Sequence, residues 1–294
     1  MRKWFGVLQT VIVCSLFIGT VSAFQVKEDW EPLLDKDLAK WDMYLSYRHQ
    51  KDYKGDMPVG EDGAPLEPIG YNKNIANVFS VTSEGKEPVL KVSGEIYGCI
   101  FTKQEYENYH LKLKVRWGDK KWEPRTDKLK DSGVLYHSIG ESGVDYWRAW
   151  MLSQEFQIME GHMGDYWTIA SSAIDVRAYI PEGNMNTVAS AKQPFLPIGA
   201  GTGNSGFCLR SEDRESPAGE WTELELICYK DKSLHIVNGQ VVMILQNSRH
   251  VKDGQTIPLT RGRIQLQSEA AEVYFKDVKI KPINQMPKKY ASLF

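Results

Sequence analysis

The segment LSQEFQIMEGHMGDYW, residues 152–167, gathers side chains that could carry out acid–base chemistry. Its glutamates, Glu155 and Glu160, stand in a stretch that alternates between apolar and polar residues, as a β-strand does. Side chains at positions i and i+2 of a strand share a face. Phe156 and Ile158 are therefore expected in the core, with Glu155 and Gln157 on the opposite face.

Glu160 falls out of phase with Glu155. A regular strand would direct it into the core, where an unpaired carboxylate is costly. We predict a β-bulge at Met159-Glu160, which would return Glu160 to the face of Glu155 and Gln157. Two carboxyl groups on one face suit sugar cleavage, in which one donates a proton and the other attacks or activates water. The alternative is a solvated strand in which Glu160 caps a turn.

Aromatic and basic residues crowd around this strand. Aromatic faces stack on the apolar faces of sugar rings, while acids and amides bind the hydroxyl groups. Some of these aromatic residues must belong to the core instead. The candidate substrate-binding residues of this region are Gln157, Arg125, Arg148, Trp150, Tyr166 and Trp167.

The elements that must position these residues are almost all strands. Residues 109–117 alternate strictly, and residues 222–230 do so again. Asn238-Gly239 predicts a tight hairpin turn within residues 233–245. The last strand, residues 272–283, carries a slip near Asp277. Helical periodicity is nearly absent, so we predict an all-β sandwich or jelly roll.

Two segments interrupt the strand pattern. Residues 118–133 read as a polar, basic loop, and residues 178–219 are rich in Gly, Pro, Ser and Asn. Irregular stretches of this length are usually functional or disordered. Neither segment divides two cores, so we expect a signal peptide at residues 1–23 and a single domain at residues 24–294.

The signal peptide is inferred from a short basic start, an uncharged apolar run and the small residues Val21-Ser22-Ala23. We therefore expect an exported protein, periplasmic or extracellular, with no membrane span in the mature chain. The net charge of −2 and the lack of a basic stripe argue against a nucleic-acid partner. Cys99, Cys208 and Cys228 remain after cleavage, and we expect buried free thiols, with Cys208–Cys228 as the one bridge to check.

Four segments in matching order resemble one bacterial family, the 3-keto-disaccharide hydrolases, and the resemblance runs from about Trp30 to Ile283. The segments are DSGVLYH (131–137), QEFQIMEGHMGDYW (154–167), GEWTELELICYKDKSLHIVNGQ (219–240) and GRIQLQSEAAEVYFKDVKIKPI (262–283). The resemblance implies a concanavalin-A-like jelly-roll sandwich of two antiparallel sheets with a carbohydrate groove on the concave face. The acid strand is also similar to the E-x-D-x-x-E strand of laminarinase-type glycosidases, except that Gln157 replaces the central Asp.

The family resemblance implies cleavage of glycosides already oxidised to a ketone at C3. Such chemistry needs a base for the C2 proton and an acid for the leaving oxygen, and Glu155, Glu160, His137 and Asp165 could fill these roles. His137 with carboxylates is also an unspecific candidate set for a divalent metal ion, so the need for such a cofactor stays open. Many family members carry a His where Glu269 stands, and Gln267 shares its strand face, so both could line the groove.

Three functions compete at this stage. The first is a secreted enzyme that cleaves the glycosidic bonds of 3-keto-glycosides, with a carbohydrate substrate as its partner. The second is a non-catalytic carbohydrate-binding module, since this fold serves both purposes. The third is an adhesion or matrix protein with no sugar site.

Overall fold

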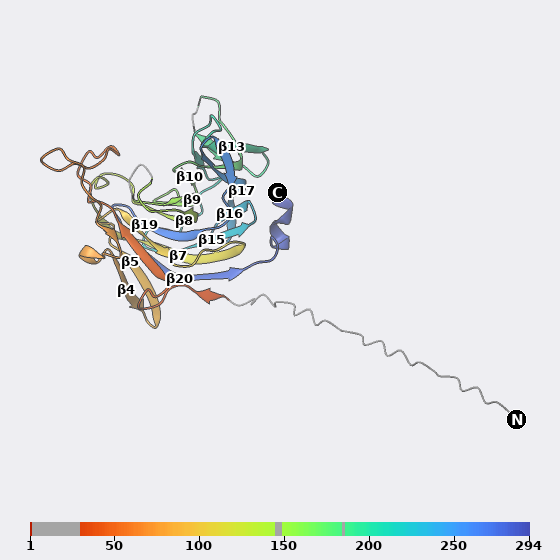
Figure 1. Cartoon of the computed structure of the whole chain (residues 1–294), viewed down its shortest axis with the longest axis horizontal. Helices are drawn as coiled ribbons and strands as arrows, with labels where there is room; N and C mark the ends of the chain where they lie inside the picture. Colours follow the sequence, from red (N-terminus) through yellow and green to blue (C-terminus); the bar gives the residue numbers. More distant parts are fainter. Residues whose placement is uncertain (2–29, 145–148, 184–185) are drawn as a thin grey trace.

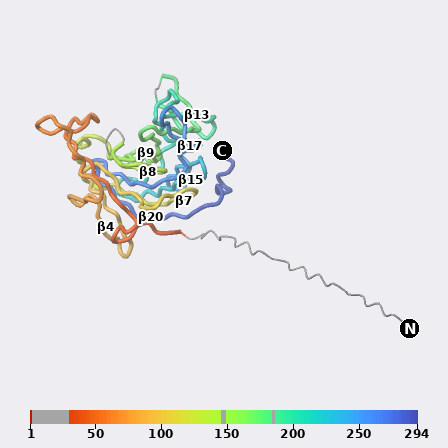
Figure 2. Tube along the Cα trace, viewed as in Figure 1, coloured from red at the N-terminus to blue at the C-terminus, as the bar shows by residue number. Residues whose placement is uncertain are grey.

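The computed structural model describes residue 1 and residues 30–144, 149–183 and 186–294. These residues form two stacked β-sheets that share one hydrophobic core, and the two layers are visible in the ribbon and in the Cα trace (Figures 1 and 2). Nearly all neighbouring strands pair antiparallel; the exception among the described pairs is β12 with β14. The structure confirms the predicted all-β jelly-roll sandwich.

In Figure 1, β7 and β20 of sheet A lie below β8 and β9 of sheet B, while β13 and β17 of sheet A lie at the upper right. Sheet A comprises β1 (Glu31–Pro32), β4 (Phe79–Glu84), β5 (Glu87–Val92), β7 (Tyr109–Lys121), β11 (Ser172–Tyr179), β13 (Phe195–Gly199), β15 (Thr222–Tyr229), β16 (Lys232–Val237), β17 (Gln240–Lys252), β18 (Gln255–Pro258) and β20 (Ala271–Pro282). Sheet B comprises β2 (Trp41–Leu45), β3 (Gly70–Tyr71), β6 (Gly98–Thr102), β8 (Asp131–Ile139), β9 (Leu152–Met159), β10 (Tyr166–Ile169), β12 (Thr187–Ala189), β14 (Phe207–Leu209) and β19 (Arg263–Ser268). Two short 3₁₀ helices, η1 (Ile75–Asn77) and η2 (Lys288–Leu293), complete the described elements.

Sheet B positions the candidate site. Its strands run in the order β2, β6, β19, β8, β9, β10, β14. Figure 1 shows β8 and β9 between flanks that rise on either side, at the 46–69 loop and at β13. We therefore call the outer face of sheet B the concave face. Alternation gives each strand one side chain for this face and the next for the core.

The core lies between the two sheets and follows the predicted alternation. Phe156 and Ile158 of β9 pack in the same cluster as Leu113 and Val115 of β7. Burying such side chains contributes roughly 1.5–3 kcal/mol each to the free energy of folding. The shared core confirms the predicted inward face of the acid strand.

Several turn predictions are confirmed. Asn238 and Gly239 both adopt positive φ, 46° and 77°, as a primed hairpin turn requires. The slip near Asp277 exists, because the register of β20 against β7 shifts between Lys276 and Lys279 and Asp277 has φ 52°. Residues 178–219 differ from expectation, since they contain the short strands β12, β13 and β14.

Two further expectations concern the chain as a whole. No helix among the described residues is long and apolar enough to cross a membrane. Cys99, Cys208 and Cys228 are free, buried thiols, so the bridge between Cys208 and Cys228 does not form. The predicted signal peptide lies almost wholly outside the described residues.

Candidate active site

Gly133 of β8 is the centre of a polar cluster on the concave face. Its cross-strand neighbour on β9 is Gln157, and the register of β19 places Gln267 on its other side. A Cβ atom at Gly133 would lie 2.4 Å from Oε1 of Glu155 and 2.5 Å from Oε1 of Gln267. The missing side chain therefore lets the ends of Glu155 and Gln267 converge above β8.

Two glutamine amides of this cluster are buried without complete hydrogen bonding. Gln157 is 5% exposed and Gln267 is 1% exposed. Within the described part of the chain, Oε1 of Gln157 and both amide atoms of Gln267 have no hydrogen-bond partner. Buried polar groups are nearly always paired in folded proteins. Convergent, unpaired polar atoms in a concave surface are typical of a ligand-binding site.

Arg125 and two carboxylates form the charged side of the cluster. Its guanidinium binds Asp131 and also lies 2.7 Å from Oε1 of Glu269. Burial and then the negative charge of Glu269 raise the pKa of Asp131, although Arg125 opposes that shift. The amide of Gln157 also interacts with Asp131, which connects the charged side to Gly133. Burial and Glu269 therefore favour the protonated form of Asp131, whereas Arg125 favours the ionised form.

An aromatic wall adjoins the charged side. Tyr97 interacts with Arg125, and the ring of His49 meets the ring of Tyr97 edge-on, 4.5 Å between centroids. His49 in turn stacks on Tyr53, with centroids 3.7 Å apart. Burial lowers the pKa of His49 to about 4, so this imidazole is neutral at physiological pH.

Trp167 forms the opposite wall. It pairs directly with Glu155 across β10 and β9, so both side chains project from the same face. The indole is 40% exposed and packs on Phe207 at 4.5 Å between ring centroids. An exposed aromatic ring next to a buried carboxylate offers a stacking platform for a sugar ring beside a group that can move a proton.

The structure does not bring Glu160 to this cluster. Strand β9 ends at Met159 and pairs there with Asp131 in regular register, so the predicted bulge is absent. Glu160 instead starts a turn, where its backbone N–H donates to the carbonyl of Lys130 and its carboxylate lies 3.5 Å from the Lys130 ammonium. The alternative of a turn residue at the strand end describes Glu160 correctly.

His137 and Asp165 are also placed away from the reacting face. A bulge in β8, with φ 55° at His137, breaks the alternation and puts the imidazole in the core beside Tyr109 and Tyr136. Burial lowers the pKa of His137 to about 3. Asp165 is fully buried and accepts hydrogen bonds from the backbone and side chain of Arg210. The structure therefore does not place either side chain with Glu155 above Gly133.

Two of the three predicted aromatic ligands are buried as well. Tyr166 faces the core, where its hydroxyl donates to Gln154. Trp150 is 2% exposed, and its indole N–H donates to the carbonyl of Gly98 at 3.2 Å. Trp167 therefore remains as the exposed aromatic of the set, and Arg148 lies outside the described residues.

The sequence reasoning missed four residues of the cluster. Asp131 and Gly133 stand in the quoted segment DSGVLYH without an assigned role, although their i, i+2 spacing matches that of Gln267 and Glu269. An isolated bridge between Asp131 and Glu269 shows that the two pairs are in register. Tyr97 and His49 carried no local signal, because only the fold brings them to Arg125.

A divalent metal ion does not fit the cluster. Among residues 30–144, 149–183 and 186–294, no three His, Cys, Asp or Glu side chains are arranged to hold one. Arg125 lies between Asp131 and Glu269, so these carboxylates already share a cation.

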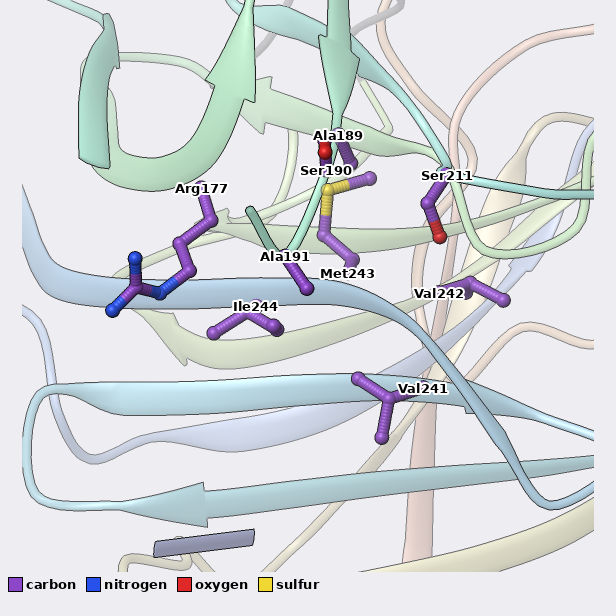
Figure 3. A pocket seen from close by; sticks show the side chains of 9 residues that line it. All are labelled: Arg177, Ala189, Ser190, Ala191, Ser211, Val241, Val242, Met243 and Ile244. Atoms are coloured by element: carbon purple, nitrogen blue, oxygen red, sulfur yellow. The ribbon is translucent and has the colours of Figure 1, made fainter. Parts of the chain in front are cut away.

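A separate hollow lies beside β11 and β17 (Figure 3). It has room for about one water molecule. Its charged group, Arg177, donates hydrogen bonds to the carbonyl oxygens of Leu293 and Gln193. The hollow is therefore part of the packing of the C-terminal segment and is not a second reactive centre.

Residues 29–281 match a family model described as a 3-keto-alpha-glucoside-1,2-lyase-like domain. A search of curated proteins found no significant match.

Solved structures similar to this chain were also found. A candidate glycosyl hydrolase from Parabacteroides distasonis is 20% identical, with 87% of this chain and 100% of that chain covered and a TM-score of 0.45. LamAcat from Zobellia galactanivorans is 10% identical, with coverages of 82% and 90% and a TM-score of 0.40. The carbohydrate-binding module CBM66 from Bacillus subtilis is 8% identical, with coverages of 69% and 91% and a TM-score of 0.38.

Proposed function

Because the chain belongs to the family of 3-keto-alpha-glucoside-1,2-lyase-like domains, we propose that it is an enzyme that cleaves the glycosidic bond of 3-keto-glycosides. The observation that supports this proposal is the convergence of Glu155 with buried amides above Gly133, directly beside the exposed Trp167. The family match points to the keto substrate, and the cluster supplies the acid–base groups.

The proposed reaction uses the acidity that the C3 ketone gives to the neighbouring C2–H. A base removes the C2 proton, the C1–O bond breaks as a C1–C2 double bond forms, and an acid protonates the departing oxygen. Water then adds across the double bond, with its hydroxyl group at C1 and a proton at C2. The sum is hydrolysis, so no oxidant or reductant is consumed.

The residues of the cluster suit these roles. Glu155 is the base, because its carboxylate reaches over the strand next to the sugar platform of Trp167. Asp131 is the acid, because burial and the charge of Glu269 raise its pKa and so favour the form that can protonate the leaving oxygen. Gln157 connects the two groups, since it neighbours Gly133 on one side and interacts with Asp131 on the other.

Product release from a plain disaccharide and from its 3-keto derivative tests the proposal. We expect free sugar from the keto substrate alone. Glu155→Gln should lower kcat/KM by about 10²–10⁴-fold with an unchanged melting temperature, since a general base contributes about that much. Glu160→Gln is the matched control and should retain activity, because Glu160 lies in a turn.

A carbohydrate-binding module is the second candidate. It needs Trp167 and the unpaired amides but no proton transfer. Release of no sugar from either substrate, with binding of a sugar that survives Glu155→Gln, would favour this function over the enzyme.

Export is part of the same proposal. It rests on the basic start and the apolar run that end at Ala23. N-terminal sequencing of protein recovered outside the cytoplasm should find Phe24 as the first residue, and an intact Met1 would contradict export by this route.

A further inference from the structure

The concave face changes from polar to apolar between β9 and β10. Glu155 and Gln157 are polar side chains that β9 directs to this face. Trp167 of β10 lies directly opposite Glu155 and pairs in turn with Phe207 of β14. The change in polarity therefore occurs beside the proposed base.

Strand register continues the concave face across β14, β12 and the end of β11. Residues two apart in one strand, and directly paired residues of neighbouring strands, project from the same side of a sheet. Leu209 stands two residues after Phe207, so both share this face. Val188 pairs with Leu209, and Tyr179 pairs with Val188. We call Trp167, Leu209, Val188 and Tyr179 the apolar stripe.

The residues that alternate with the stripe confirm its orientation. Cys208, Ala189 and Ala178 pack with Tyr166 in a core cluster, so they point away from the concave face. The stripe therefore lies on the outer side of these strands, on the flank that rises from β10 toward β13 (Figure 1).

Both ends of the stripe are exposed aromatic rings. Trp167 is 40% exposed and Tyr179 is 43% exposed, while Leu209 and Val188 are half-buried between them. Single apolar side chains are common on protein surfaces, whereas a contiguous apolar surface beside polar groups marks a binding site. Because the stripe begins next to Glu155, it continues the candidate active site.

The stripe suits an apolar group better than a second sugar or a second copy of the chain. The side chains in its middle, Leu209 and Val188, neither donate nor accept hydrogen bonds. A sugar there would take its hydroxyl groups out of water without gaining partners from these side chains, whereas an aromatic ring would gain apolar contact. A stable dimer interface needs about 20–30 residues a side, far more than the stripe supplies.

We infer that the apolar stripe is a leaving-group subsite and that the preferred substrate is a glycoside whose leaving group is aromatic rather than a second sugar. The inference rests on the proposed function in placing the reacting sugar beside Glu155 and Trp167. Neighbouring strands are about 4.8 Å apart, so the three steps from β10 to β11 span roughly 14 Å. This length accommodates the sugar ring followed by two linked aromatic rings that end at Tyr179.

Equilibrium binding of unoxidised glucosides, measured by calorimetry, tests the subsite without any turnover. The probes are methyl, phenyl and biphenyl glucoside in both anomeric forms, with maltose and cellobiose as disaccharides. We expect affinity to rise roughly 10-fold from methyl to phenyl and again from phenyl to biphenyl, because each ring buries further apolar area. The disaccharides should bind no more tightly than methyl glucoside.

Two variants locate the leaving group along the stripe. Tyr179→Ser should weaken the binding of biphenyl glucoside by roughly 5- to 10-fold and keep the preference for phenyl over methyl, because one ring does not reach β11. Val188→Thr keeps the shape of the side chain and adds a hydroxyl group in the middle of the stripe. It should reduce the preference for biphenyl over methyl by roughly 3- to 10-fold.

Ile75→Ser is the matched control for the loss of an exposed apolar side chain. Ile75 is 48% exposed in η1, which follows β3 beyond the other end of sheet B. This variant should keep the whole affinity series. Equal affinities across the series, tighter binding of a disaccharide, no binding of any probe, or a biphenyl preference that survives both stripe variants would overturn the inference.

Sugar release from the 3-keto forms of the same probes separates this inference from the proposed reaction. An affinity series that depends on Tyr179, without release of sugar from any keto probe, would leave the subsite standing and refute the reaction. Release from all keto probes, with equal affinities across the series, would support the reaction and refute the subsite.

Discussion

Gln154 and Gln157 lie three residues apart on β9, and both side chains are buried, but they point to opposite faces of the sheet. On the core face, Nε2 of Gln154 donates to the carbonyl of Ala173 at 3.1 Å and to Oγ of Ser248 at 3.0 Å, and its Oε1 accepts from the hydroxyl of Tyr166. On the concave face, Oε1 of Gln157 has no partner in the described part of the chain. On its core face, β9 therefore carries an amide whose polar atoms all have hydrogen-bond partners. On its concave face it carries an amide oxygen that has none in the described part of the chain.

The contrast separates polarity that serves folding from polarity that serves a ligand. A buried amide with every hydrogen bond made stabilises the fold and fixes its register. A buried amide without hydrogen-bond partners lowers the free energy of unfolding, and proteins tolerate that loss mainly at functional sites. By this criterion Gln157 and Gln267 belong to the site, while Gln154 and Tyr166 belong to the scaffold.

The largest expected effect comes from the charged part of the concave face, where Arg125 closes the network. Arg125→Met would leave Asp131 and Glu269 buried without their cation, and we expect the free energy of unfolding to fall by about 3–5 kcal/mol. Urea denaturation of the purified variant measures the loss. A triple variant that adds Asp131→Asn and Glu269→Gln should recover most of the stability; if it does not, the ion pairs are not what Arg125 contributes.

The glutamine pair on β9 gives the next largest effect and tests the contrast itself. Gln154→Met should lower the free energy of unfolding by about 3 kcal/mol, because the Tyr166 hydroxyl and the Ala173 carbonyl each lose a buried hydrogen bond. Gln157→Met should change stability little and reduce sugar binding. Thermal denaturation and calorimetry of both variants measure the two quantities, and equal losses of stability would remove the distinction between the faces.

Acid should destabilise the folded protein through the buried imidazole of His137. Burial lowers the pKa of His137 to about 3, whereas an unfolded histidine titrates near 6.5. Below pH 6.5 the imidazole of His137 therefore binds a proton in the unfolded chain but not in the folded one. The contribution of neutral His137 to the free energy of unfolding is complete above pH 6.5 and is lost as the pH falls toward 3. At pH 4.5 the loss is about 2.7 kcal/mol.

His137→Asn isolates that contribution, since Asn also tolerates the positive φ at this position. Melting temperatures of the wild type and the variant between pH 7.5 and 4.5 give the two slopes. We expect the shallower slope for His137→Asn. Parallel curves would mean that His137 is not neutral in the folded protein.

The sequence was sufficient to predict the fold and the residues that β9 contributes to the concave face. Strict alternation in residues 109–117 and 154–158 predicted which side chains enter the core, and the Asn238-Gly239 turn predicted the hairpin. The errors came from bulges, because a left-handed residue that is not glycine leaves no periodic signal. The expected bulge at Glu160 is absent, and the bulge that exists turns His137 from the concave face into the core.

The rest of the site depends on the register between distant strands. Glu269 meets Asp131 and Arg125 only because β19 pairs with β8. Glu155 reaches Gln267 only because a glycine stands between them on the intervening strand. The spacing of residues along the chain does not reveal either relation. The sequence therefore predicts Glu160 as the second carboxyl group, whereas the acid that we propose, Asp131, lies on the neighbouring strand.

Substitution of Trp167 gives the smallest expected effect. It tests whether the ligand-binding surface extends from the amides of Gln157 and Gln267 to the indole. Its ring is exposed beside Glu155 and makes few contacts that folding needs, so Trp167→Ala should leave the melting temperature nearly unchanged. A stacked sugar ring would lose about 1 kcal/mol of binding free energy, roughly a 5-fold rise in Kd. The ring of Phe207 packs against the indole with centroids 4.5 Å apart, and Phe207→Leu serves as the control, because it retains the indole of Trp167 itself. If Trp167→Ala binds the methyl glucosides as well as the wild type does, the sugar lies over the amides alone, and the wall formed by His49 and Tyr97 becomes the stacking surface to test.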